Sequence, residues 1–193
     1  MKKKNILLAT LAIILLIAVI LISQRLDLEG IGKKYGYIGI FTVSLMSCMT
    51  IVFPIPYIPI IITISATTAL NPFWIGIFGG LGAAIGEFTG YAIGKGSSEA
   101  ISNRWGGQIS TLRGFFEKYG FWSIVLVTAT PLPTGVMYLV AGMASYSAIR
   151  LLVAGIIGKT IFVSAVAYFG ENIYSLSNLS LPAILIVGGI IAI

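Results

Sequence analysis

Four stretches of this chain are long and apolar enough to cross a lipid bilayer as helices: residues 5–23, 72–94, 148–170 and 178–193. A helix needs about 20 residues to cross a hydrocarbon core roughly 30 Å thick. Of the 193 residues, 58% are hydrophobic and 9% are charged, whereas soluble domains carry about 25% charged residues. The chain is therefore predicted to be an all-α integral membrane protein.

Two further apolar regions, 37–70 and 119–145, are each interrupted by two prolines one residue apart. Proline removes a backbone donor and clashes with the preceding turn, so such a motif cannot continue a helix. Non-helical backbone survives in hydrocarbon only where protein or water covers it. The pattern favours re-entrant hairpins that turn at the prolines and leave on the side they entered, although two ordinary kinked helices are the alternative. The prolines are Pro54, Pro56, Pro131 and Pro133.

The two interrupted regions resemble copies of one unit, because three short matches recur in the same order in both halves. Paired interrupted segments of this kind indicate a transporter-type site between inverted repeats. Each repeat is expected to be a re-entrant hairpin followed by a transmembrane helix. The matches are Lys34-Tyr35-Gly36-Tyr37 with Lys118-Tyr119-Gly120-Phe121, Pro54-Ile55-Pro56 with Pro131-Leu132-Pro133, and Gly76-Ile77-Phe78-Gly79 with Gly155-Ile156-Ile157-Gly158.

Charge placement predicts the orientation. With the N-terminus in the cytoplasm and both hairpins returning to their own side, most basic residues face the cytoplasm, as the positive-inside rule requires. We expect a multi-pass protein of the plasma membrane. Residues 5–23 resemble a signal peptide, but no small-x-small cleavage pattern follows them, which favours a retained helix.

This topology divides the chain into three parts. An N-terminal helix and loop occupy 1–30, a central domain occupies 31–175, and a C-terminal helix occupies 176–193. Between the two halves, residues 95–118 place apolar side chains every three to four positions. That spacing predicts an amphipathic helix at the membrane interface.

Two charged residues lie inside the predicted spans and away from their ends, Glu87 in 72–94 and Lys159 in 148–170. Arg150 lies at the cytoplasmic end of the second span. A charge inside a membrane costs at least about 2.5–3.5 kcal/mol, so it usually faces the protein interior and has a partner. On the predicted topology long side chains can bridge the two positions, and we predict an ion pair. The pair is either a structural link between two glycine-rich helices or the point where a lipid phosphate or a coupling ion is met.

A stripe of small residues surrounds Glu87 and predicts close packing against another helix. The stripe consists of Gly82, Gly86, Gly90 and Gly94. The chain has no histidine, which is the commonest general base near neutral pH and the commonest metal ligand. It has one cysteine. We therefore expect no enzyme, metal site or cofactor. The net charge of +6 is attributed to the cytoplasmic bias of basic residues rather than to nucleic-acid binding.

These motifs resemble the DedA superfamily, which carries the VTT, or SNARE-associated Golgi protein, domain. The resemblance rests on the run Gly-Glu-x-x-Gly-Tyr-x-x-Gly at 86–94, the two proline hairpins, and Pro133 followed by Tyr-Leu-Val-Ala-Gly at 138–142. It covers about residues 35–170. It implies two inverted re-entrant hairpins and a role in lipid translocation. Bacterial members are linked to recycling undecaprenyl phosphate, some with proton coupling, and eukaryotic relatives to phospholipid scrambling.

The sequence departs from the family pattern at both hairpins. Acidic residues typical of the first hairpin tip are missing from 53–62, and arginines typical of the second are missing from 127–140. The family's coupling residues therefore do not carry over; Glu87 and the hairpin prolines and glycines do. Thr130 and Thr134 are candidates to line the second hairpin, although threonines near a helix break more often satisfy freed backbone groups. Topology makes Arg113 and Arg150 candidates for a lipid headgroup.

The function expected from these observations is translocation or scrambling of a lipid, either a phospholipid or a polyprenyl-phosphate carrier, at a site between the hairpin tips. Two alternatives stay open. One is a transporter of a small solute or ion on the same scaffold, and the other is a non-transporting membrane assembly factor. The expected partner is membrane lipid through its phosphate, and a homo-oligomer is left open.

Overall fold

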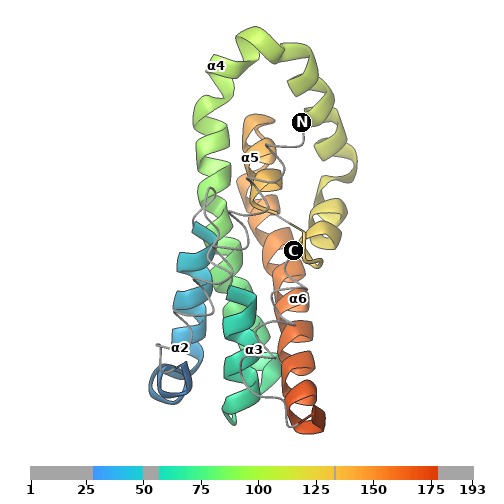
Figure 1. Cartoon of the computed structure of the whole chain (residues 1–193). Helices are drawn as coiled ribbons and strands as arrows, with labels where there is room; N and C mark the ends of the chain where they lie inside the picture. Colours follow the sequence, from blue (N-terminus) through green and yellow to red (C-terminus); the bar gives the residue numbers. More distant parts are fainter. Residues whose placement is uncertain (1–27, 50–56, 133, 178–193) are drawn as a thin grey trace, which may run out of the picture.

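The computed structural model describes residues 28–49, 57–132 and 134–177. Within these ranges the chain forms five α-helices and no strand (Figure 1), which confirms the all-α class for this part. The predicted helices 5–23 and 178–193 lie outside the described residues, as do Pro54, Pro56 and Pro133. The helices are α2 (Leu28–Met49), α3 (Tyr57–Thr67), α4 (Pro72–Thr128), α5 (Gly135–Met143) and α6 (Ala148–Ser177).

Two helical stretches in the described part are long and apolar enough to cross a membrane, Pro72–Ser97 in α4 and Ala148–Gly170 in α6. They agree with the spans predicted at 72–94 and 148–170. The start of α4 is set locally. The Asn71 side chain accepts a hydrogen bond from the backbone N–H of Phe73 at 2.9 Å, and Pro72 occupies the first turn, where no backbone donor is needed.

α4 is one helix of 57 residues, and it includes the segment 95–118 that was predicted to lie at the membrane interface. It rises along the molecule, arches over and descends again to Thr128 (Figure 1). The physical reason is the lack of a helix breaker, since no proline occurs between Pro72 and Pro131. Residues 95–118 are helical, as predicted, but continuous with the helix on both sides.

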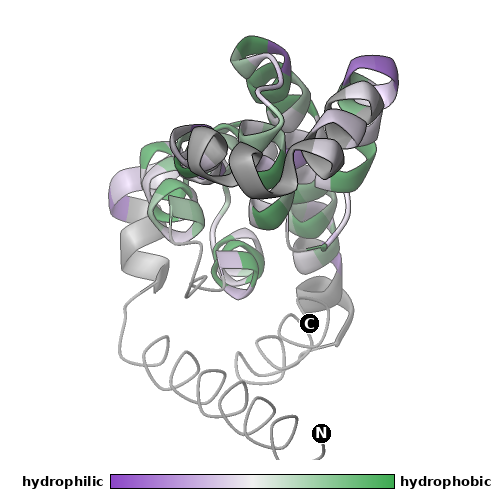
Figure 2. Cartoon of the chain, turned by 90° about the horizontal axis from the view of Figure 1, so that it is seen from above, coloured by the Kyte–Doolittle hydropathy of each residue, from purple (hydrophilic) through white to green (hydrophobic). Residues whose placement is uncertain are grey.

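The outer surface of the bundle is apolar. Figure 2, seen from above, shows hydrophobic residues spread over the described helices. Several of the most exposed side chains are large and apolar, among them Ile38, Trp122 and Leu126. Soluble proteins expose single apolar side chains but few large apolar patches, and here exposed large apolar side chains occur on α2, α4, α5 and α6. The surface therefore fits a protein whose described helices contact lipid.

Glycines let the helix backbones of this bundle approach closely. A Cβ at Gly82 would lie 2.3 Å from the Phe41 carbonyl oxygen of α2, and one at Gly86 would lie 2.5 Å from the Leu45 oxygen. A Cβ at Gly94 would instead lie 2.0 Å from a backbone oxygen of α5. Gly90 is buried. The predicted glycine stripe therefore packs against two different helices. Gly82 and Gly86, before Glu87, face α2, and Gly94, after Glu87, faces α5.

The matched Lys-Tyr-Gly motifs of the two halves share one contact and differ in another. Lys34 lies over the Tyr35 ring at 5.4 Å, and Lys118 lies over the Tyr119 ring at 5.0 Å. Gly36, however, has φ 52° and breaks the helical geometry inside α2, whereas its counterpart Gly120 lies within α4. The same residue type therefore provides backbone freedom in one half and continues a helix in the other.

Candidate functional site

A buried ion pair joins the two membrane-capable helices. The Lys159 ammonium of α6 lies 2.8 Å from Oε1 of Glu87 on α4. Lys159 is 3% exposed and Glu87 is 6% exposed. This geometry confirms the ion pair predicted from the two intramembrane charges. Each charge is tolerated in the interior because the other compensates it.

A third residue, Thr134, is hydrogen-bonded to the ion pair. It is buried immediately before α5, and its hydroxyl donates to Glu87 Oε1 at 2.5 Å. Hydrogen bonds to an ionised carboxylate are stronger than those between neutral groups. The other candidate threonine, Thr130, donates to the Val127 carbonyl oxygen at 2.6 Å. Thr130 therefore satisfies the helix end, whereas Thr134 links the start of α5 to the charges.

Three further side chains lie near the pair, and none of them was predicted as a site residue from the sequence. Cys48 near the end of α2, Tyr57 at the start of α3 and Tyr138 in α5 each lie close enough to interact electrostatically with Glu87. Tyr57 and Cys48 also interact with Lys159. The signal for Tyr57 was available, because it directly follows the first proline motif. Helices α2, α3 and α5 thus all bring a polar group to the charges on α4 and α6.

Some polar atoms around the pair have no hydrogen-bond partner among the described residues. They include the second carboxylate oxygen of Glu87 and the hydroxyl of the fully buried Tyr138. Native proteins leave few buried polar groups unpaired, so each such group needs an explanation, and a bound water or ion is one of them. The site therefore offers an ammonium, one open carboxylate oxygen and a phenol in a mostly apolar interior.

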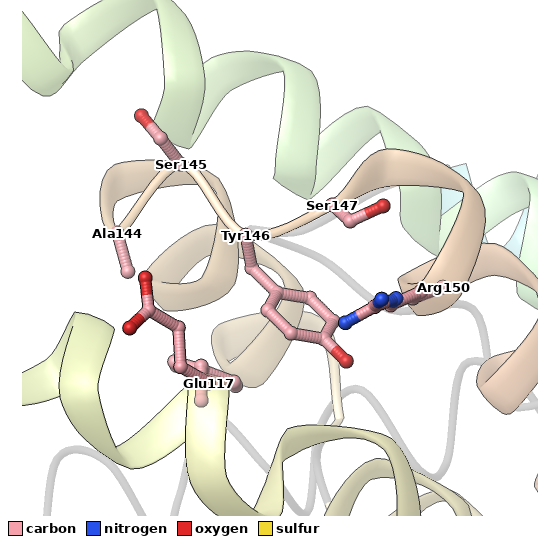
Figure 3. A pocket seen from close by; sticks show the side chains of 7 residues that line it. Glu117, Ala144, Ser145, Tyr146, Ser147 and Arg150 are labelled. Carbon is pink, nitrogen blue, oxygen red and sulfur yellow. The ribbon is translucent and has the colours of Figure 1, made fainter.

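The remaining candidates lie elsewhere. Pro131 is exposed, and the side chain of Arg113 falls outside the described part. Arg150 lies nine residues before Lys159 on α6, about 14 Å away along the axis at 1.5 Å per residue. It lines a separate cavity of about 240 Å³ (Figure 3). The described residues contain no group of three or more histidine, cysteine or carboxylate side chains placed to hold a metal ion.

Comparison with curated proteins and with solved structures finds no match. A family model, the VTT domain, matches residues 53–172. The matched region is more than half of the chain, and it contains both membrane-capable helices and the three buried residues Glu87, Thr134 and Lys159. The chain therefore belongs to the VTT-domain family, the membrane-associated family of DedA and SNARE-associated Golgi proteins.

Proposed function

We propose that this protein translocates or scrambles a lipid across the bilayer, and that the headgroup passes the Glu87–Lys159 ion pair. The observation that carries the proposal is the buried pair itself, joined through Thr134 to the beginning of α5. Buried charges inside a membrane protein are costly and usually mark an ion or substrate path. Membership of the VTT-domain family adds a membrane role of the DedA type. The proposal includes no catalytic step.

In this proposal the short helices form two re-entrant hairpins. α2 and α3 form the first, and the end of α4 with α5 forms the second, close to the bounds 37–70 and 119–145. Support comes from their placement, because α2 and α3 lie toward one end of the long axis and α5 toward the other (Figure 1). Two hairpins entering from opposite sides would make inverted repeats. The N-terminus and Arg150 would then lie on the cytoplasmic side of the plasma membrane.

The buried pair predicts the charge of the lipid that this path accepts. A lipid phosphate that reaches Lys159 would compete with Glu87 for the ammonium. Glu87 would then remain as an uncompensated buried charge, which is unfavourable unless it binds a proton or another cation. Its open second oxygen is available for that role. The best-fitting substrate is therefore a lipid with an anionic phosphate whose acyl chains stay in the bilayer.

A fluorescent-lipid assay in proteoliposomes tests this function. Wild type is expected to expose inner-leaflet lipid to a membrane-impermeant quencher. Glu87→Gln and Lys159→Gln are expected to slow this exposure by at least about tenfold, the loss that follows removal of about 1.4 kcal/mol of stabilisation. The matched control is Lys34→Gln, because Lys34 is an exposed lysine on α2 and should leave the rate unchanged.

The assay separates lipid movement from the two alternatives. If wild type matches empty liposomes for both phospholipid and polyprenyl phosphate, lipid translocation is wrong. Substrate-dependent uptake of a soluble compound into the same vesicles would then support a solute transporter. Stable co-purification with another membrane protein, without any transport, would support an assembly factor.

A further inference from the structure

A second polar site lies between the descending part of α4 and the loop that joins α5 to α6. It is a cavity of about 240 Å³, here called the loop cavity, and its polar lining consists of Glu117, Ser145, Tyr146, Ser147 and Arg150. Figure 3 shows Glu117 and Arg150 on either side of the Tyr146 ring. No salt bridge joins either of these two charges to another described residue. The loop cavity therefore presents a cation and an anion that do not neutralise each other directly.

The Tyr146 ring lies between the two charges, and contacts with neighbouring residues hold it in place. The Tyr146 ring lies 5.4 Å from the Phe116 ring, and the Tyr146 carbonyl oxygen accepts a hydrogen bond from the Tyr91 hydroxyl at 2.8 Å. The preceding residue, Ser145, has φ 54°. A non-glycine residue in this conformation costs free energy and persists only where the surroundings enforce it. These contacts hold Tyr146 against α4, with its ring between Glu117 and Arg150 (Figure 3).

The size of the loop cavity limits what it can hold. Pockets for whole drug-sized ligands usually have about 300–1,000 Å³, so 240 Å³ suits a headgroup and not a lipid with its chains. Acyl chains would have an apolar surface beside it, because Ile149, next to Arg150, is 76% exposed and Val153 lies one turn further on the same helix. Polar headgroup and apolar chains would therefore meet matching surfaces.

The chemistry of the lining is that of a zwitterion site. A guanidinium binds phosphate oxygens through a planar array of donors, and the Ser147 hydroxyl is a further donor on the Arg150 side of the lining (Figure 3). Burial raises the pKa of the Tyr146 phenol above its ordinary value, while Arg150 acts in the opposite direction. The phenol therefore keeps its proton at neutral pH and can also donate. On the other side, the carboxylate of Glu117 attracts a cation and repels a headgroup that carries only negative charge.

We propose that the loop cavity binds a phosphate ester that also carries an ammonium group, with the phosphate at Arg150 and the ammonium at Glu117. The inference deepens the proposed lipid function and rests on it for the source of the ligand, an amine-bearing phospholipid. A soluble phosphate ester with the same headgroup has the same chemistry. Binding here would precede passage of the headgroup toward the buried pair.

Native mass spectrometry of the full chain in detergent, titrated with defined lipids, tests the site. Wild type is expected to retain phosphatidylethanolamine over phosphatidylglycerol. Arg150→Gln should weaken binding of both by about tenfold, equivalent to about 1.4 kcal/mol. Glu117→Gln should weaken phosphatidylethanolamine and strengthen phosphatidylglycerol, so that the preference disappears. Lys118→Gln is the control, because this exposed neighbour lies over the Tyr119 ring, and it should keep the wild-type preference.

Competition with soluble glycerophosphoethanolamine identifies the source of the ligand. Displacement of the lipid only at a large excess supports a membrane ligand, and displacement at equal concentration supports the same headgroup chemistry from a soluble source. Equal wild-type binding of the two lipids, or an unchanged preference in Glu117→Gln, overturns the proposal. Binding is measured without transport, so failure of the two proposals is distinguishable. Glu87→Gln should stop translocation and still bind phosphatidylethanolamine with the wild-type preference.

Discussion

Replacing Lys159 alone with methionine is expected to destabilise the folded protein by about 3–5 kcal/mol, because Glu87 would be left as a buried charge without its partner. Replacing both residues with methionine is expected to recover most of this loss, since apolar side chains of similar volume often substitute for a buried pair at little cost. Thermal unfolding of the purified protein in detergent, followed by far-UV circular dichroism, gives the comparison. A double variant less stable than the single variant would contradict this account of the pair.

The same double variant decides between the structural and the functional interpretation of the pair. If the charges lie on the lipid path, the Glu87→Met/Lys159→Met protein should fold and yet fail to move lipid in proteoliposomes. The reason is that two thioether side chains offer a phosphate neither a cation nor a proton-binding group. A folded double variant that moves lipid at the wild-type rate would make the pair a structural link between α4 and α6, and would remove the site from this position.

Gly94→Ala is expected to destabilise the protein by about 1–3 kcal/mol, the usual cost of overpacking a closely packed interior. The new Cβ would lie 2.0 Å from the Leu139 carbonyl oxygen and 3.1 Å from the Met143 nitrogen. Both atoms are backbone atoms of α5, so the whole helix would have to move away from α4. Because Thr134 lies immediately before α5, its hydrogen bond to Glu87 should weaken too, and lipid translocation should slow.

Gly96→Ala is the matched control for this prediction. It lies two residues further along the same helix, and a Cβ there would meet nothing within 4 Å. Alanine favours helix over glycine by up to about 1 kcal/mol, so the unfolding midpoint should stay the same or rise. Midpoints measured side by side in one detergent test both variants. If Gly94→Ala and Gly96→Ala behave alike, the close approach of α4 and α5 is wrong.

The ion pair was predictable from sequence because hydrocarbon makes an isolated charge so unfavourable. Glu87 is the only acidic residue in the predicted spans, and Lys159 is the only basic residue away from their ends. Each therefore had few other partners, and the observed contact at 2.8 Å agrees with this expectation. The spans were predictable for a related reason, since the thickness of the bilayer fixes how long an apolar helix must be. Both features were predictable because they depend on residue chemistry and on the hydrocarbon environment of the bilayer.

Other features depended on contacts between residues far apart in the chain. Thr130 and Thr134 lie four residues apart around the same proline motif, yet Thr134 reaches Glu87 because α5 packs against α4. From the local sequence, either threonine could bond to a backbone carbonyl near the proline motif or to a more distant side chain. The position of Arg150 in the loop cavity likewise depends on how α4 and the loop before α6 fold against each other.

The sequence by itself determined that this chain forms apolar helices, which two stretches are long and apolar enough to cross a membrane, and that Glu87 needs Lys159 as a partner. These properties follow from hydropathy, backbone chemistry and the cost of buried charge, all of which act residue by residue. Only the tertiary structure decided which hydroxyls reach that pair, which glycines face which helix, and that Glu117 and Arg150 share a cavity. Those choices depend on side-chain geometry between distant segments, which a linear pattern does not specify.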